Sequence, residues 1–375
     1  MPSRRVTRIG IAAVLWSIAL APAALAAAPA LQGVSAGERA RVEKLIEGAK
    51  KEGELVILTN TTRPEPAAKI FEDFKRHYGL PDAKMSFTLK SSGAVISSVK
   101  ADITSGRNTY DIIQVGAPPF YRQLLERGAL MKYDSPHYAN FIPEVTGKAP
   151  GAFAAPGYYI SSYVIVAGIV WNPKHVKKDI KTWQDVLDPA HKGKIIIADI
   201  QQSETTVNFY GGVRKFLPRS YFEEVAKLDP IFVVRLAGIV RQITQGEKWI
   251  GLLISIRQAY DVAVKGVDIK SVIPPEGTVT LGYPLAILAK APHPNLAKLW
   301  IDYVHSPDGH KTFLELQGFT SGMKGIQPSP LLASFLPPLE KTKIIPMDWD
   351  KIGENEIAAW RKEFSEIFYN YKSIP

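Results

Sequence analysis

Between residues 54 and 128 the spacing of apolar residues alternates between two periods, and this alternation constrains the fold more than any other feature. Three short β-prone runs, at 54–58, 84–89 and 111–115, each lead through a polar loop into a segment with helical spacing. A helix between successive strands returns the chain to the start of the sheet, so the strands pair in parallel. The sequence therefore predicts an α/β fold with a mainly parallel sheet. Its loops gather at the carboxyl edge of the strands, where ligands bind.

The same order of strand, polar loop and helix returns near residues 192–212. A β-branched run ends at Ala198, residues 199–203 are polar, and an amphipathic segment opens at Ser203 or Glu204. The first turn of a helix has unpaired N–H groups and the positive end of the helix dipole, which together attract an anion or a polar ligand. We expect these loops to face one another across a cleft.

Two long β-prone runs, 158–171 and 279–289, divide the pattern into two parts. We interpret them as a pair of hinge strands that cross between two lobes. Between them we also expect a helix over 231–244 and another capped by Ser220. The resulting division is a signal peptide at 1–26, lobe 1 at 27–157 with 290–345, lobe 2 at 158–289, and a C-terminal helix at 346–375.

The first 26 residues have the three-part pattern of a secretory signal peptide. Three arginines precede an apolar run at 9–20, and Ala24-Leu25-Ala26 follows as a cleavage site. A retained anchor is the alternative, but this run is short for a membrane-spanning helix. Ser3-Arg4-Arg5 leaves the twin-arginine export route open beside the general one. The chain has no cysteine for a lipid anchor, so we expect a periplasmic protein.

Composition and motifs exclude several classes of function. The absence of cysteine removes disulfides, thiolate metal sites and a cysteine nucleophile. The net charge is +10, but no Lys/Arg run interleaves with aromatic residues, so we expect no nucleic-acid partner. Ser97 and Lys100 match the S-x-x-K motif of serine acylases, without that class's other motifs. We therefore expect that the protein is not an enzyme and has no cofactor and no resident metal site, with a bound metal ion as solute left open. We also expect a monomer.

Six short stretches, in this order, carry a resemblance to a known family. They are Val170-Trp171-Asn172-Pro173, the segment 182–195 with Thr182-Trp183 and Lys192-Gly193-Lys194, Gln245-Gly246-Glu247, Pro275-Glu276-Gly277-Thr278, the segment 292–297, and Ser306-Pro307-Asp308-Gly309. Over residues 54–325 the chain resembles the periplasmic solute-binding proteins of ABC importers. The resemblance implies a type II periplasmic-binding fold: two α/β lobes, each with a central mainly parallel sheet flanked by helices, and a two-strand hinge. It also implies a ligand in the cleft and delivery to the permease subunits of the importer.

The resemblance is nearest to the ferric-ion and small-anion binders of that family. The ferric binders supply two adjacent tyrosines after the strand that follows Gly246-Glu247. Here those positions fall near Ile256 and Arg257, and only Tyr260 lies close. A guanidinium can hold a carboxylate or phosphoryl group with two hydrogen bonds. We therefore expect a small anionic or polar organic solute, with ferric ion as one alternative and an enzyme or sensor on the same fold as another.

Candidate ligand-binding residues come from the polar loops, the crossings and the segment after 256. The loops supply hydroxyls and backbone N–H groups, although capping and turn formation would also explain such residues. For the two crossing tyrosines the alternative is packing against the hinge, and for the arginine it is a solvated helix position. The candidates are Thr59, Asn60, Thr61, Ser91, Ser92, Gly93, Gly116, Ala117, Tyr158, Tyr159, Ser203, Thr205, Thr206, Arg257 and Tyr260.

Overall fold

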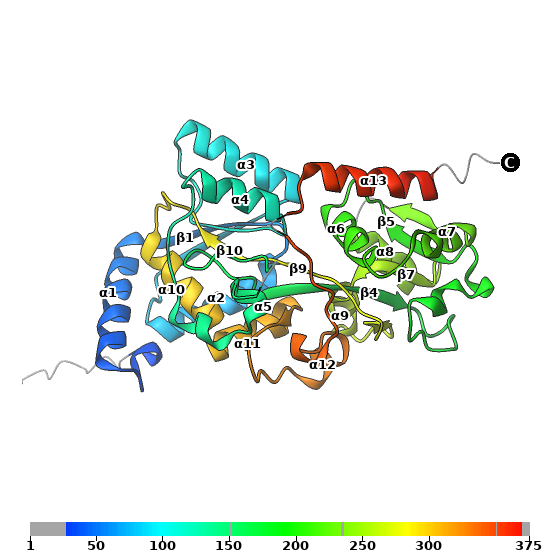
Figure 1. The fold of residues 1–375 in the computed structure, drawn as a ribbon. Helices are drawn as coiled ribbons and strands as arrows, with labels where there is room; N and C mark the ends of the chain where they lie inside the picture. Colours follow the sequence, from blue (N-terminus) through cyan, green and yellow to red (C-terminus); the bar gives the residue numbers. More distant parts are fainter. Residues whose placement is uncertain (1–27, 150–151, 234–235, 350, 370–375) are drawn as a thin grey trace, which may run out of the picture.

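The computed structural model describes residues 28–149, 152–233, 236–349 and 351–369. Their strands form two separate sheets, each accompanied by its own helices (Figure 1). The signal-peptide prediction for 1–26 lies outside the described residues. Within the described ranges no helix has the length and apolar character needed to cross a bilayer.

The first sheet has the strand order β10-β3-β1-β2. Strand β1 pairs in parallel with β2 and β3, which confirms the parallel strands expected from the strand-helix alternation, and β10 is antiparallel to β3. The strands are β1 (Glu54–Thr59), β2 (Lys84–Leu89), β3 (Ile112–Gln114) and β10 (Leu285–Ile287). The helices with this sheet are α1 (Ala36–Glu52), α2 (Pro64–Tyr78), α3 (Ser92–Ser105), α4 (Pro118–Glu126), α10 (Pro294–His305) and α11 (Pro307–Gln317). We call this part lobe 1.

The second sheet is mixed and has seven strands. Strand β5 is parallel to β6 and β7, whereas β4 is antiparallel to β7, β8, β9 and β11. The strands are β4 (Tyr163–Trp171), β5 (Ile195–Ala198), β6 (Ile231–Val233), β7 (Ile250–Ser255), β8 (Lys270–Val272), β9 (Thr280–Gly282) and β11 (Thr320–Ser321). Its helices are α6 (Glu204–Val213), α7 (Arg219–Lys227), α8 (Leu236–Thr244), α9 (Arg257–Ala263) and α13 (Glu354–Phe368). We call this part lobe 2.

Shorter elements join these two parts. They are α5 (Pro143–Thr146), α12 (Pro330–Phe335) and the 3₁₀ turns η1 (Pro29–Leu31), η2 (Pro136–Asn140), η3 (Gln184–Leu187), η4 (Pro189–His191) and η5 (Leu339–Lys341).

The two crossings differ in how they connect the sheets. All nine residues of β4 are buried, and β4 receives partners on both sides. The return crossing is two short strands: β9 pairs with β4 in the second sheet and β10 pairs with β3 in the first. Tyr283 and Pro284 separate them, and the proline has no N–H to continue a ladder. The two-lobe fold is therefore confirmed, while the division of the chain at residues 158 and 289 stays a prediction.

Two local expectations were wrong. Residues 231–233, expected to begin a helix, form β6 beside β5, and the helix begins only at Leu236. The β-branched and aromatic residues Ile231, Phe232 and Val233 suit a strand once a neighbour offers its edge. Ser220 does not cap α7, whose N-cap is Pro218 without a side-chain hydrogen bond.

The C-terminal helix belongs with lobe 2. Helix α13, red in Figure 1, lies against α6 and α7. Phe364 is fully buried there, 5.3 Å from the ring centre of Tyr210. The chain thus returns to lobe 2 after α10 and α11 have completed lobe 1.

Candidate functional site

The loop after β1 is built by Thr59 and Gln114 at the carboxyl edge of the first sheet. The Thr59 hydroxyl accepts the backbone N–H groups of Thr61 and Thr62, each at 3.1 Å, and donates to Gln114 Oε1 at 3.2 Å. Thr59 and Gln114 are fully buried. The role of Thr59 is therefore to fix the loop, which leaves Asn60 and Thr61 to present its outer face.

Asn60 connects this loop to the start of α3. Its Nδ2 donates to the hydroxyl of Ser92 at 2.8 Å, and Ser91 caps the helix by accepting the N–H of Ala94. The Oδ1 atom of Asn60 is buried and has no hydrogen-bond partner among the described residues. A buried carbonyl oxygen without a donor costs free energy, so this atom is a candidate acceptor for a ligand.

The start of α6 supplies the matching surface of lobe 2. Ser203 caps the helix by accepting the N–H of Thr206 at 3.1 Å, and the helix begins at Glu204, one of the two starts expected from the sequence. The Thr206 side chain takes part in the same cap, because its hydroxyl donates to Ser203 Oγ. The Thr205 hydroxyl instead lies 3.2 Å from the phenol oxygen of Tyr283. The first turn of α6 therefore faces the return crossing.

Tyr283 stands where lobe 1, lobe 2 and the hinge meet. Burial raises the pKa of this phenol, while the Thr205 hydroxyl, the Arg257 charge and the Asn60 side chain oppose the rise. Gly116 permits the ring's position, because a Cβ at residue 116 would lie 2.8 Å from the Tyr283 Cζ atom. The phenol is thus surrounded by candidate residues from both lobes.

Arg257 reaches from lobe 2 to the β1 loop. Its Nη1 donates to the Thr61 hydroxyl at 2.6 Å and its Nη2 to the Thr61 carbonyl at 3.0 Å. The guanidinium carbon lies 4.5 Å from the ring centre of Phe319, a cation–π contact. The residue is only 5% exposed, so the alternative of a solvated helix position is wrong.

The charge of Arg257 persists in this buried position. Burial lowers its pKa to about 10, and nearby Asp261 partly opposes the shift, so the group is cationic at neutral pH. Its Nε is buried and makes no hydrogen bond within the described residues. Asp261 also pairs with Arg63 at 3.0 Å, and burial raises the pKa of Asp261. Arg257 and Arg63 carry two positive charges and Asp261 carries one negative charge, so this part of the site is net positive.

Three of the predicted residues lie away from the cluster of side chains around Tyr283. Tyr159 packs against Tyr121 at 4.8 Å between ring centres, and the neighbouring Tyr158 is bound through its backbone N–H to the carbonyl of Ala155. Tyr260 donates its hydroxyl to the backbone carbonyl of Glu315. These contacts fit the packing alternative for the crossing tyrosines. Ala117, next to Gly116, is the N-cap residue of α4.

Four residues of the group were missed from the sequence: Gln114, Tyr283, Phe319 and Arg63. Tyr283 carried a usable signal, because the segment Gly282-Tyr283-Pro284 interrupts an otherwise apolar crossing run. The other three are recognisable only from the tertiary contacts of distant segments.

The chemistry of the group is that of a site rich in donors. It holds one buried guanidinium, three hydroxyls on Thr61, Thr205 and Tyr283, and the N-termini of α3 and α6. Donors in such an arrangement bind oxyanions and hydroxylated molecules. Among the described residues no group of three or more His, Asp or Glu side chains is placed to hold a metal ion.

Comparison with known proteins places this arrangement in context. The family described as bacterial extracellular solute-binding protein matches residues 59–311. A Haemophilus influenzae protein described as uncharacterized is 28% identical over 310 residues, covering 75% of this chain and 83% of its own. The structure of the periplasmic binding protein AfuA from Actinobacillus pleuropneumoniae, with exogenous fructose-6-phosphate bound, has a TM-score of 0.68 at 23% identity and covers 84% and 99% of the two chains. Iron-bound HitA from Pseudomonas aeruginosa has a TM-score of 0.63 at 19% identity and covers 83% and 99%.

Proposed function

The chain belongs to the bacterial extracellular solute-binding proteins, the solute-binding components of ABC transporters, and we propose that it captures a small anionic or polar organic solute between its lobes. The solute then passes to a membrane permease, with no covalent chemistry on the way. We further propose that the protein acts in the periplasm as a monomer. Binding free energy would shift an open–closed equilibrium, and the permease would recognise the closed form.

The proposal rests on the gathering of Arg257, Thr205 and Asn60 around Tyr283, from both lobes and both helix N-termini. Arg257 already bridges to Thr61 of the opposite lobe. A solute oxyanion that took the place of Thr61 would connect the lobes through the same two Nη atoms. The same contact of Arg257 would then both hold the solute and favour the closed form.

Two atoms of the site narrow the class of solute. The buried Nε of Arg257 makes no hydrogen bond, although it lies 3.9 Å from Oδ2 of Asp261, and the buried Oδ1 of Asn60 is an acceptor without a donor. A molecule with an anionic group and a hydroxyl satisfies both. The sugar phosphate bound to AfuA has both groups and is the first probe. Ferric ion, the metal of iron-bound HitA, is the alternative, and the burial that raises the pKa of Tyr283 opposes the phenolate that Fe(III) prefers.

Calorimetry and thermal unfolding of the purified protein test the proposal. The probes are fructose 6-phosphate, inorganic phosphate, small carboxylates and ferric citrate. A bound solute at 100 times its Kd adds about 2.7 kcal/mol to the free energy of unfolding. Arg257→Gln should weaken binding by about tenfold to a hundredfold, because it removes charge-assisted hydrogen bonds. Arg241→Gln, an exposed arginine on α8, is the matched control and should leave the affinity unchanged.

Two results would overturn the proposal. One is equal affinity of the Arg257→Gln variant and the unchanged protein for every anion that binds. The other is a visible charge-transfer band with ferric salt that disappears in Tyr283→Phe, since that would assign the cleft to tyrosinate-bound iron. Turnover of a bound solute would favour the enzyme alternative.

A further inference from the structure

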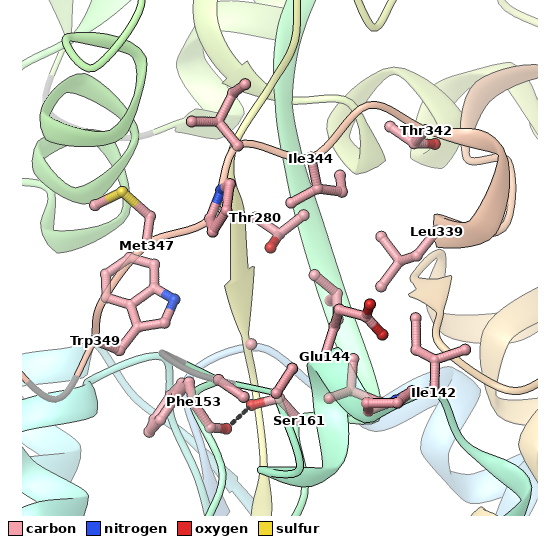
Figure 2. Close-up of a pocket in the computed structure, with 18 of the residues that line it drawn as sticks. Ile142, Glu144, Phe153, Ser161, Thr280, Leu339, Thr342, Ile344, Met347 and Trp349 are labelled. Atoms are coloured by element: carbon pink, nitrogen blue, oxygen red, sulfur yellow. Dashed lines mark hydrogen bonds between the residues drawn. The ribbon is translucent and has the colours of Figure 1, made fainter.

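A cavity of about 560 Å³ lies on the other side of the hinge from Tyr283. Along β9, Thr280 and Gly282 line this cavity, whereas Leu281 and Tyr283 lie beside Gly116 in the candidate site. Successive side chains of a strand point to opposite faces. The cavity and the cleft therefore share the return crossing but open on opposite faces of it. Figure 2 shows the cavity side, with Thr280 of β9 labelled.

The cavity is closed by a segment near the C-terminus, residues 339–349, which we call the strap. Its Ile345 N–H donates to the carbonyl of Thr278 at 2.7 Å, and its Lys343 carbonyl accepts the N–H of Thr278 at 3.1 Å. Further along, the carbonyl of Trp349 accepts a hydrogen bond from Arg122 of α4 at 2.8 Å. The strap is thus tied to the return crossing at one point and to lobe 1 at another. Helix α5, β4 and β9 form the remaining walls.

The lining combines an apolar surface with unbalanced negative charge. Its apolar part includes Phe153, Val164, Ile344, Met347 and Trp349. The charged groups in the lining are two carboxylates, Glu144 of α5 and Glu340 of η5, and no lysine, arginine or histidine is among the described lining residues. Neither carboxylate has a hydrogen bond or an ion pair with another described residue.

The carboxylate of Glu144 is directed into the cavity. In Figure 2 its carboxylate points into the space enclosed by Thr280, Ile344 and Leu339. Trp349 and Phe153 present aromatic rings at the other end of the same space. Carboxylates attract a cation electrostatically, and aromatic faces attract it through their quadrupole. An anionic molecule would meet two like charges and no counter-charge from the lining.

We propose that this cavity is a second ligand site, for an amphipathic organic cation: an amine or quaternary ammonium group on an apolar body. The apolar body fills the space among Val164, Ile344 and Met347, and the cationic group lies by Glu144 and Glu340. The volume is in the range of sites for small organic molecules. This inference does not depend on which solute occupies the cleft.

Calorimetric titration with three probes of equal chain length tests the site: octyltrimethylammonium, 1-octanol and octyl sulfate, each below its micelle or solubility limit. No cleft solute is added, so failure here leaves the proposed function untouched. The cation should bind one-to-one, the alcohol more weakly and the sulfate least. Glu144→Gln with Glu340→Gln should weaken the cation by about tenfold, because two exposed charge pairs are lost, and leave the alcohol unchanged.

A filling variant gives the second measurement. Thr280→Phe keeps a strand-forming residue in β9 and places a ring in the cavity, so it should abolish binding of both the cation and the alcohol. If this variant does not fold, the glutamine pair decides the question alone. The proposal is overturned if no probe saturates, if the sulfate binds as tightly as the ammonium, or if the glutamine pair leaves the cation's affinity unchanged.

Discussion

Acidification should destabilise this protein through two buried histidines that the binding site does not use. His305 and His310 are fully buried between α10, α11 and the start of β4. In each ring Nδ1 faces a backbone carbonyl, of Ile301 and Val304, which can only accept, so Nδ1 carries the proton. The Nε2 atoms then accept the hydroxyls of Ser162 and Ser321, each at 2.7 Å. Both imidazoles are therefore held in the neutral form.

The size of the effect follows from the shift in pKa. Burial lowers the pKa of both His305 and His310 from 6.5 to about 3. The unfolded chain binds protons below pH 6.5 while the folded protein does not, so the free energy of unfolding falls as the pH falls. Between pH 7.5 and pH 5.0 each histidine removes about 2 kcal/mol, and the pair about 4 kcal/mol. The loss continues until the pH approaches 3.

Urea unfolding at several pH values measures this loss. Because carboxylates also titrate, the comparison is with His310→Asn, whose neutral side chain removes one histidine's share. The variant is less stable at pH 7.5, but its stability should fall by about 2 kcal/mol less between pH 7.5 and 5.0. His175→Asn, at an exposed imidazole, is the matched control and should follow the unchanged protein. Parallel curves for His310→Asn and the unchanged protein would refute the argument, as would NMR signals of His305 or His310 that titrate near pH 6.5.

Two further substitutions test the geometry of the site and the attachment of α13. Gly116→Val places a side chain against the Tyr283 ring, so solute binding should be lost and the free energy of unfolding should fall by about 1–3 kcal/mol. Gly37→Ala, in open space on α1, should leave binding intact, and binding by the valine variant would contradict the close approach. Phe364→Ala should lower the free energy of unfolding by about 3–5 kcal/mol in urea unfolding, because the ring is fully buried between α13 and the rest of lobe 2. A cost below about 1 kcal/mol would show that α13 does not pack as described.

Local signals in the sequence predicted most elements and several caps. Ser91 and Ser203 cap α3 and α6, which fits the capping alternative for these loop residues; the N-cap hydrogen bond spans only three residues and is therefore a local feature. The expectation of a helix over 231–244 was wrong at residues 231–233, although 236–244 are helical, and the reason is physical. Ile231, Phe232 and Val233 form a strand because β5, more than 30 residues earlier in the chain, offers an edge for pairing. The spacing of apolar residues within a short segment contains no information about so distant a partner.

The sequence by itself determined the alternation of strand and helix, the polar loops at strand ends and the family resemblance, since each depends on residues close together in the chain. The tertiary structure decided which of those polar residues meet. Arg257 and Thr61 are 196 positions apart and Thr205 and Tyr283 are 78 apart, yet both pairs are in hydrogen-bond contact. The cavity behind the hinge likewise exists only because residues 339–349 return across β9. Contacts of this kind depend on how two lobes pack across a hinge, and spacing along the chain carries no record of that.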